Sequence, residues 1–211
     1  MPLKFRLLQT ETCHKGFFRL ERHRLEHETF AGGTVGPLDR ELLIRGPVVV
    51  VLPYDPVADR VVLLEQFRMG AFRDPEGAWL IEVVAGICES GETLEGVARR
   101  ELLEETGCVG GRLERVCEFY ASPGGSDEVA TLFVAEIDSE GVGGVHGLGA
   151  EGEDIRVFVR DREDAWSAVR DGRIRVAPAL IALQWLQLEH QSLRDRWASA
   201  KAPVRSERKR L

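Results

Sequence analysis

The stretch GICESGETLEGVARRELLEETGC, residues 86–108, joins a glycine-containing loop to a helix in which acidic side chains are crowded together. When the helical part is placed on a wheel at about 100° per residue, Leu94 and Leu102 mark an apolar arc that should face the core. Glu101 and Glu105 fall in the middle of that arc. A solvated acidic face would put them on the opposite side, so these carboxylates need another explanation.

Two carboxylates that face the protein interior are costly unless a positive charge neutralises them. Arg100 lies beside the arc and can reach Glu104, at the arc's edge, from the flank, but the wheel does not place it between the two core-facing acids. A hard divalent cation such as Mg²⁺, which prefers oxygen ligands, is one neutraliser. A salt-bridged helix end is the alternative.

The rest of the chain mixes apolar strand-like runs with helical segments. Thr93 is expected to cap the first helix, and Gly107 to end it in a left-handed conformation. Because no regular strand–helix–strand rhythm is present, the sequence predicts an α+β domain with a mixed sheet covered by helices. Strands are expected over 17–26, 40–46, 47–53, 60–68, 79–86, 129–137 and 154–160, and helices over 93–106, 161–170 and 178–197.

Composition excludes several classes of protein. The formal charge of the 211 residues is −7, and because residues 201–211 carry five basic and one acidic side chain, net +4, the remainder carries −11. Duplex nucleic-acid binding needs a basic footprint and is therefore not expected. No apolar run is long enough to span a membrane, and no export signal is recognised. Four cysteines without a CxxC pair favour reduced thiols in the cytoplasm.

The opening stretch resembles the box of the Nudix hydrolases, a pattern written Gx5Ex7REUxEExGU in which U is apolar. Only the last U departs, because Cys108 stands there. Around the box, LLEQFR, WLIEVVAG, ASPGGSDE and GLGAEGEDIRV are similar to bacterial ADP-ribose pyrophosphatases, and the resemblance covers roughly residues 14–197. The matching box positions are Gly86, Glu92, Arg100, Glu101, Leu102, Glu104, Glu105 and Gly107.

This resemblance implies a Nudix fold, a mixed β-sheet sandwiched between helices (α/β/α), with an N-terminal antiparallel β extension. It divides the chain into an N-terminal β region (1–46), a hydrolase domain (47–200) and a basic tail (201–211) expected to be disordered. Strands within 14–46 match a piece that relatives swap between two subunits. A homodimer is therefore expected.

The resemblance also implies which residues bind the cofactor, Mg²⁺ or Mn²⁺, and which perform the chemistry. The metal ligands would be the Ala85 carbonyl and the carboxylates of Glu101, Glu105 and Glu153. Glu151 matches the general base that takes a proton from the attacking water. Glu104 is either a further ligand or a partner of Arg100, and Arg100 would also pair with Glu92 to hold the loop and helix in shape.

Four residues match substrate-contacting positions: Phe17, Arg40, Arg68 and Ser122. Arginines supply fixed donors and charge for a diphosphate, and an aromatic ring can stack on a base. For Phe17 the alternative is ordinary strand packing, and for Ser122 it is a turn.

The implied function is hydrolysis of the diphosphate bond of ADP-ribose to AMP and ribose 5-phosphate in the cytoplasm, without nucleic-acid or membrane partners. One alternative is a Nudix hydrolase for another nucleotide sugar, such as GDP-mannose. Another is a non-catalytic ADP-ribose sensor, which would be expected to have a damaged box and a DNA-binding appendage. Here the box acids are intact.

Overall fold

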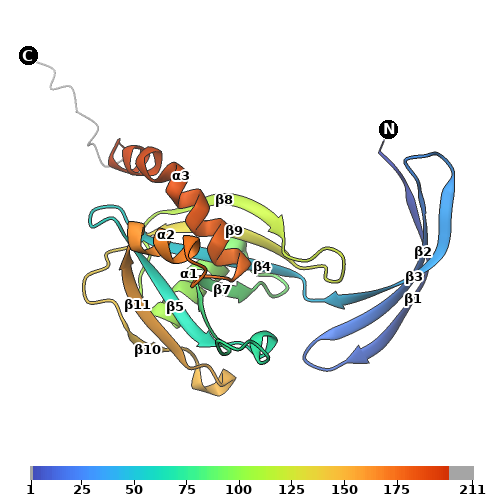
Figure 1. Cartoon of the computed structure of the whole chain (residues 1–211), viewed down its shortest axis with the longest axis horizontal. Helices are drawn as coiled ribbons and strands as arrows, with labels where there is room; N and C mark the ends of the chain where they lie inside the picture. Colours follow the sequence, from blue (N-terminus) through green and yellow to red (C-terminus); the bar gives the residue numbers. More distant parts are fainter. Residues whose placement is uncertain (1, 200–211) are drawn as a thin grey trace, which may run out of the picture.

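The structure, a computed structural model, describes residues 2–199 apart from the side chain of Glu151, and the predicted basic tail lies outside the described residues. Within that part the chain forms two β-sheets, and helices pack on one of them (Figure 1). The strands are β1 (Phe5–Lys15), β2 (Arg19–Glu28), β3 (Thr34–Ile44), β4 (Pro47–Asp55), β5 (Arg60–Phe67), β6 (Trp79–Glu82), β7 (Val84–Ile87), β8 (Leu113–Tyr120), β9 (Val129–Glu136), β10 (Gly144–His146) and β11 (Ile155–Asp161). The helices are α1 (Leu94–Thr106), α2 (Arg162–Arg170) and α3 (Ala177–Ser199), with short 3₁₀ turns η1 (Met69–Ala71) and η2 (Gly149–Glu151).

The main sheet runs in the order β10-β11-β5-β4-β9-β8, with β6 added to β5 and β7 added to β4. β4 pairs in parallel with β9, and the other pairs are antiparallel, so the predicted mixed sheet is confirmed. β4 is apolar on both faces because helices cover both. Val49 and Val51 point into one core and Val50 and Leu52 into the other, as strand alternation requires.

Helix α1 covers one face of this sheet. Its side chains Val97, Ala98 and Leu102 are buried against β4 and its neighbours. Its ends are as the sequence predicts: the Thr93 hydroxyl accepts the Gly96 N–H at 3.1 Å, and Gly107 adopts φ +70°. These capping interactions set where the helix that carries Glu101, Glu104 and Glu105 begins and ends.

Helices α2 and α3 cover the opposite face. Ala182 and Leu186 of α3 pack, fully buried, in the same core as Leu63 and Tyr54 of the sheet. The result is the predicted α/β/α sandwich. None of the helices in the described part of the chain is long and apolar enough to cross a membrane.

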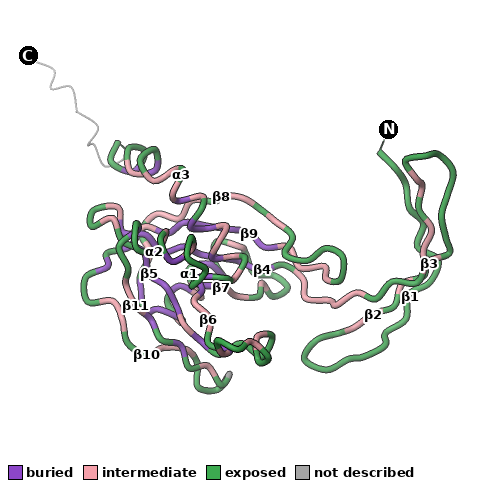
Figure 2. Tube along the Cα trace, viewed as in Figure 1, coloured by how far each residue is buried: buried purple, intermediate pink, exposed green. Residues whose placement is uncertain are grey.

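The N-terminal sheet β1-β2-β3 stands apart from the sandwich (Figures 1 and 2). Every residue of β1 is exposed, and most of β3 is too. Apolar side chains are left without cover, including Phe5 at 76% and Phe30 at 99% exposure. A sheet of this kind is an unusual monomer surface, because exposed strands with apolar side chains invite association.

The sheet is attached to the sandwich where β3 meets the loop before β9. Leu43 exchanges backbone hydrogen bonds with Gly125 and Asp127. The Asp127 carboxylate accepts the N–H groups of Arg45 and Gly46 at 2.7 and 3.1 Å. The attachment is therefore specific rather than a free linker.

Several strands differ from the sequence-based expectation. β1, β8 and the short β10 were not predicted, and the predicted strand 79–86 is divided into β6 and β7. β8 has a register shift between Arg115 and Cys117, which interrupts the alternation that would have revealed it. The division into regions 1–46 and 47–200 stays a prediction.

We expect Asp127→Ala to loosen the attachment of the N-terminal sheet, because two N–H groups lose their acceptor. Amide hydrogen exchange over residues 43–46 should accelerate by roughly tenfold or more, since one lost hydrogen bond with a charged acceptor is worth about 1.5–3 kcal/mol. Asp127→Asn keeps an acceptor oxygen and is the matched control. Equal exchange rates in the two variants would contradict this role.

Candidate active site

Strand alternation assembles the site on the α1 side of the sheet. Val62 and Leu64 of β5 point into the core beneath α1, and Gln66 and Arg68 continue that face. Glu82 of β6 is paired opposite Leu64 and therefore shares the face. Polar groups thus replace apolar ones toward the end of β5, next to the box helix.

Glu105 is the most deeply buried acid of the box, with 3% of its surface exposed. Its Oε2 accepts the Ala85 N–H at 3.1 Å, and it forms no ion pair with any described residue. Burial raises the pKa of Glu105 to about 8; the Ala85 hydrogen bond and Arg68 act against this, and the charges of Glu101 and Glu153 add to it. The core-facing position predicted for Glu105 is confirmed.

Glu101 lies against the loop before the helix. A Cβ atom on Gly86 would stand 2.0 Å from Glu101 Oε1, so only glycine leaves room for this carboxylate. Burial raises the pKa of Glu101, Arg100 lowers it, and Glu104 and Glu153 raise it further. The glycine of the box is therefore a requirement of the site itself.

Arg100 holds the outer side of the acidic cluster. Its Nη1 donates to Glu101 at 2.8 Å and to Glu104 at 3.0 Å, and its Nε lies 3.4 Å from Glu92. The pairs with Glu104 and Glu92 were expected. The contact with Glu101 was not expected from the wheel, because a long side chain can bend toward its sequence neighbour.

The loop before β11 brings a third acid. Glu153 accepts the Leu148 N–H at 2.9 Å, and its charge raises the pKa values of both Glu101 and Glu105. Glu151 ends the η2 turn of the same loop, but its side chain lies outside the described part of the structure. The loop therefore places Glu153 beside the box, and the role of Glu151 stays a prediction.

Arg68 is the cation whose charge acts on the buried Glu105. Its Nε and Nη2 form a fork on the Glu82 carboxylate, with distances of 2.7–3.0 Å. Burial lowers the pKa of Arg68, but the hydrogen bonds and charge of Glu82, together with the charges of Glu105 and Glu153, raise it overall. Arg68 is thus brought to the site, already paired with a residue that the sequence analysis did not single out.

The other predicted substrate residues lie elsewhere in this chain. Phe17, 88% exposed, lies in the turn between β1 and β2, and Arg40 lies in β3. Ser122 lies in the loop that attaches the N-terminal sheet, where its carbonyl accepts the N–H groups of Gly125 and Ser126. No hydrogen bond or ion pair joins Phe17, Arg40 or Ser122 to the box helix in the described part of the chain.

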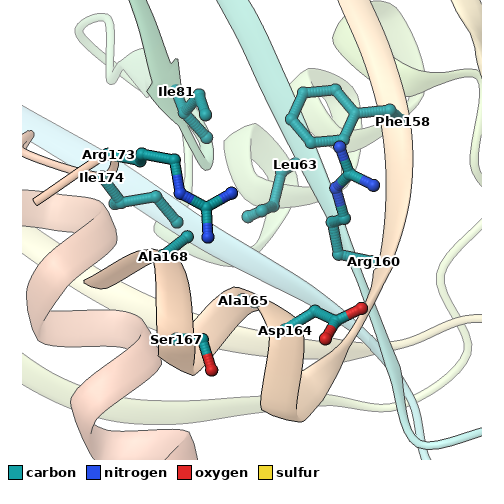
Figure 3. A pocket seen from close by; sticks show the side chains of 10 residues that line it. All are labelled: Leu63, Ile81, Phe158, Arg160, Asp164, Ala165, Ser167, Ala168, Arg173 and Ile174. Carbon is teal, nitrogen blue, oxygen red and sulfur yellow. The ribbon is translucent and has the colours of Figure 1, made fainter. Parts of the chain in front are cut away.

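A cavity of about 250 Å³ opens on the other face of the sheet, under α2 (Figure 3). Leu63 and Ile81 contribute to its apolar lining, and the side chains of Arg160 and Arg173 also line it (Figure 3). Ile81 and Glu82 are consecutive, so they point to opposite faces of the sheet. This cavity is separate from the acidic site.

The acidic site fits a hard divalent cation. It offers oxygen donors: the buried Glu105 carboxylate, which is not ion-paired within the described part of the chain, and the Glu101 carboxylate, for which Gly86 leaves room. The charge of Glu153 acts on both. Among the described side chains, no three acidic, histidine or cysteine groups are already at ligand spacing. The alternative of a salt-bridged helix end accounts for Glu101 and Glu104, which pair with Arg100, but it does not account for Glu105.

Comparison with known proteins identifies this arrangement. A family model described as NUDIX domain matches residues 44–201. The chain belongs to the Nudix family. Its box helix is the Nudix box, and the resemblance inferred from residues 86–108 is confirmed.

Two curated Nudix relatives are named ADP-ribose pyrophosphatase. The one from Escherichia coli K12 is 47% identical, over 91% of this chain and 92% of its own length. The one from Haemophilus influenzae is 44% identical, over 90% of this chain and 89% of its own length. A protein from Yersinia pestis named GDP-mannose pyrophosphatase is 32% identical over 89% of this chain and 94% of its own. A crystal structure titled as an ADP compounds hydrolase matches with a TM-score of 0.66 at 20% identity, covering 88% of this chain and 96% of that one. That last likeness confirms the Nudix fold.

The sequence analysis missed Glu82 and Gln66, which lie buried beside Arg68. A signal was present: WLIEVVAG is an apolar strand with one acidic residue in its interior. A charged side chain in such a strand needs a partner. The partner is the arginine that follows the neighbouring strand.

We expect Glu105→Gln to cost metal binding and activity but not the stability of the metal-free protein. The folded protein keeps a proton on Glu105 that the unfolded chain releases above its ordinary pKa of 4.5, so wild-type stability falls as pH rises from 4.5 to about 8. Glutamine removes this penalty. The melting temperature of the metal-free variant, relative to wild type, should therefore be higher at pH 8 than at pH 5.

Thermal unfolding with a chelator present tests this expectation. Glu95→Gln, at an exposed position in the first turn of α1, is the control for a generic loss of charge. A variant that melts several degrees below wild type at pH 8, yet keeps its turnover, would contradict the assignment of Glu105.

Proposed function

We propose that this Nudix protein hydrolyses the diphosphate bond of ADP-ribose to AMP and ribose 5-phosphate, with Mg²⁺ or Mn²⁺ as cofactor, in the cytoplasm. The observation that carries the proposal is the buried Glu105 carboxylate, which forms no ion pair with a described residue and lies in the field of Glu101 and Glu153. Relatives at 44–47% identity named ADP-ribose pyrophosphatase support the substrate. Four free cysteines accord with a reducing compartment.

Glu101, Glu105 and Glu153 would hold the cation, together with the Ala85 carbonyl. When bound, a divalent ion lowers the pKa of a coordinated water and offsets negative charge on phosphate oxygens. Arg100 holds Glu104 and Glu92 at the rim, which keeps the loop and helix in register. Glu104 is thus more a partner of Arg100 than a proton acceptor.

Glu151 is the proposed general base. Glu101 and Glu105, when committed to a cation, are poor proton acceptors, and the Glu104 carboxylate is already paired with Arg100 at 3.0 Å. Glu151 belongs to a glycine-flanked loop that also carries Glu153. A carboxylate on this loop can take the proton of the attacking water while its neighbour binds the cation.

The substrate-binding residues are proposed to come from both chains of a homodimer. Arg68 would supply charge to the diphosphate, while Phe17 would stack on adenine and Arg40 and Ser122 would contribute polar contacts. Phe17, in the turn between β1 and β2, and Arg40, in β3, belong to the N-terminal sheet. This sheet stands away from α1 of its own chain (Figure 1). A second copy of the chain would bring them to the site.

A substrate panel tests the function. With Mg²⁺ present, ADP-ribose should show the highest kcat/KM, above GDP-mannose, the substrate named for the 32% identical relative. A preference for GDP-mannose would reassign the substrate within the family. Tight binding of ADP-ribose without turnover would favour a sensor.

Glu151→Gln should lower kcat by about two to four orders of magnitude, the usual scale of general base catalysis, with KM little changed. Glu104→Gln, at the rim of the same site, is the matched comparison and should cost less. Both are to be measured at saturating Mg²⁺. If Glu104→Gln is the slower enzyme and Glu151→Gln stays within about tenfold of wild type, the base is misassigned.

Mixing two inactive variants tests the shared site. Glu105→Gln keeps the N-terminal sheet intact, and Arg40→Ala keeps the box intact. Random exchange into a dimer that shares its sites should restore about one quarter of wild-type activity, because half of the dimers are mixed and each has one complete site. No recovery after denaturation and joint refolding, or an active monomer in sedimentation, would contradict the proposal.

A further inference from the structure

The pair formed by Arg68 and Glu82 differs from the surface ion pairs of this chain in the burial of its carboxylate. The Glu82 side chain is 8% exposed, and both of its oxygens accept from the guanidinium. Gln66, itself buried, donates to Glu82 Oε2 at 3.4 Å. Arg68 uses Nε and Nη2 for this fork, which leaves Nη1 directed elsewhere.

A competing set of partners lies close to Arg68. The charges of Glu105 and Glu153 both raise its pKa, so the guanidinium is within their field. An arginine that turned toward those acids would occupy the oxygens that a cation needs. The fork on Glu82 is therefore in competition with an ion pair inside the metal site.

We propose that Glu82 is a positioning residue: it holds Arg68 away from the cation-binding carboxylates and aims its free nitrogen at the substrate diphosphate. This inference rests on the proposed function for the identity of the substrate. Glu82 acts through Arg68 and touches neither substrate nor cation. Its own contribution is a fixed, negatively charged carboxylate whose two oxygens both accept hydrogen bonds from Arg68.

The geometry explains why a carboxylate is required. Glu82 lies on β6, which is paired with β5 along four residue pairs that end one residue before Arg68. The Arg68 N–H donates to the Ala78 carbonyl at 2.8 Å, so backbone and side chain are both held. A neutral amide at position 82 would keep the shape but not the charge that outweighs Glu105 and Glu153.

The first measurement is Mn²⁺ binding to the full-length protein without substrate, by isothermal titration calorimetry. Glu82→Gln should weaken binding by about 10- to 100-fold, the usual effect of losing a residue that supports a metal site. The double variant Arg68→Gln/Glu82→Gln should recover binding to within about threefold of wild type, because the competing arginine is gone. A purely structural role for Glu82 predicts no such recovery.

The second measurement is steady-state hydrolysis of ADP-ribose at saturating Mn²⁺. Here the double variant should keep the raised KM of Arg68→Gln, since the diphosphate has lost its cation. Recovery of metal affinity without recovery of KM separates the two tasks of the pair. Recovery of both would remove Arg68 from the substrate site.

The matched control is Asp59→Asn. Asp59 also pairs with a buried arginine: Arg162 Nε donates to both Asp59 oxygens at 3.1 and 3.2 Å, and this pair joins the turn between β4 and β5 to the start of α2, away from the acidic site. The variant should lower the melting temperature and leave Mn²⁺ affinity and KM unchanged. If it shifts Mn²⁺ affinity as far as Glu82→Gln, the effect is general destabilisation and the proposal fails.

Failure of the role proposed for Glu82 can be distinguished from failure of the proposed hydrolysis of ADP-ribose. If wild type prefers another nucleotide sugar, the Mn²⁺ titrations still decide the role of Glu82. If Glu82→Gln does not fold, the double variant decides, because both of its replacements are neutral and similar in length. Double-variant binding more than about tenfold weaker than wild type, or unchanged binding in a folded Glu82→Gln, overturns the inference.

Discussion

The buried carboxylate of Glu105 is the constraint on which the rest of the site depends. A leucine at that position would pack against the sheet at no electrostatic cost, whereas the acid keeps its proton up to about pH 8. One backbone N–H, from Ala85, is all that the described chain donates to it. Under the proposed function, a divalent cation bound at Glu105 would turn this destabilisation into binding energy: the less the protein itself neutralises Glu105, the more a cation would gain by doing so.

The same constraint explains the surroundings. Gly86 must lack a side chain so that Glu101 can lie beside the loop. Arg68, in the proposed role, would have to be near enough to contact the substrate yet be kept out of the acidic cluster. Strand alternation makes this possible, because each strand under the site has a second face. On β6, Ile81 packs against the apolar core below α2, and Glu82 faces the opposite side, where it pairs with Arg68. Catalytic demands and packing demands are therefore met by adjacent residues that do not interfere.

The sequence predicted the structure correctly where a single helical or strand periodicity of apolar residues was present. Helix α1 was predicted with its caps, and the inward positions of Glu101 and Glu105 followed from the wheel. The prediction failed where that periodicity was interrupted or absent. The bulge in β8 hides its alternation, and β1 has no buried face at all, so neither produces a readable pattern. The fork on Glu82 depends on which strands are neighbours, and a single sequence does not contain that information.

The N-terminal sheet carries the same reasoning to the assembly. Its attachment is pinned at Leu43 and Asp127, so the sheet is held at a defined place relative to the sandwich while its apolar side chains stay uncovered. Phe5 and Phe30 are buried only if another surface covers them. In the proposed two-fold dimer each N-terminal sheet would reach the other sandwich, and the burial of apolar surface that drives association would also deliver substrate-binding groups. Assembly and substrate recognition would then depend on one contact, so a chain that has not found its partner would not have a complete site.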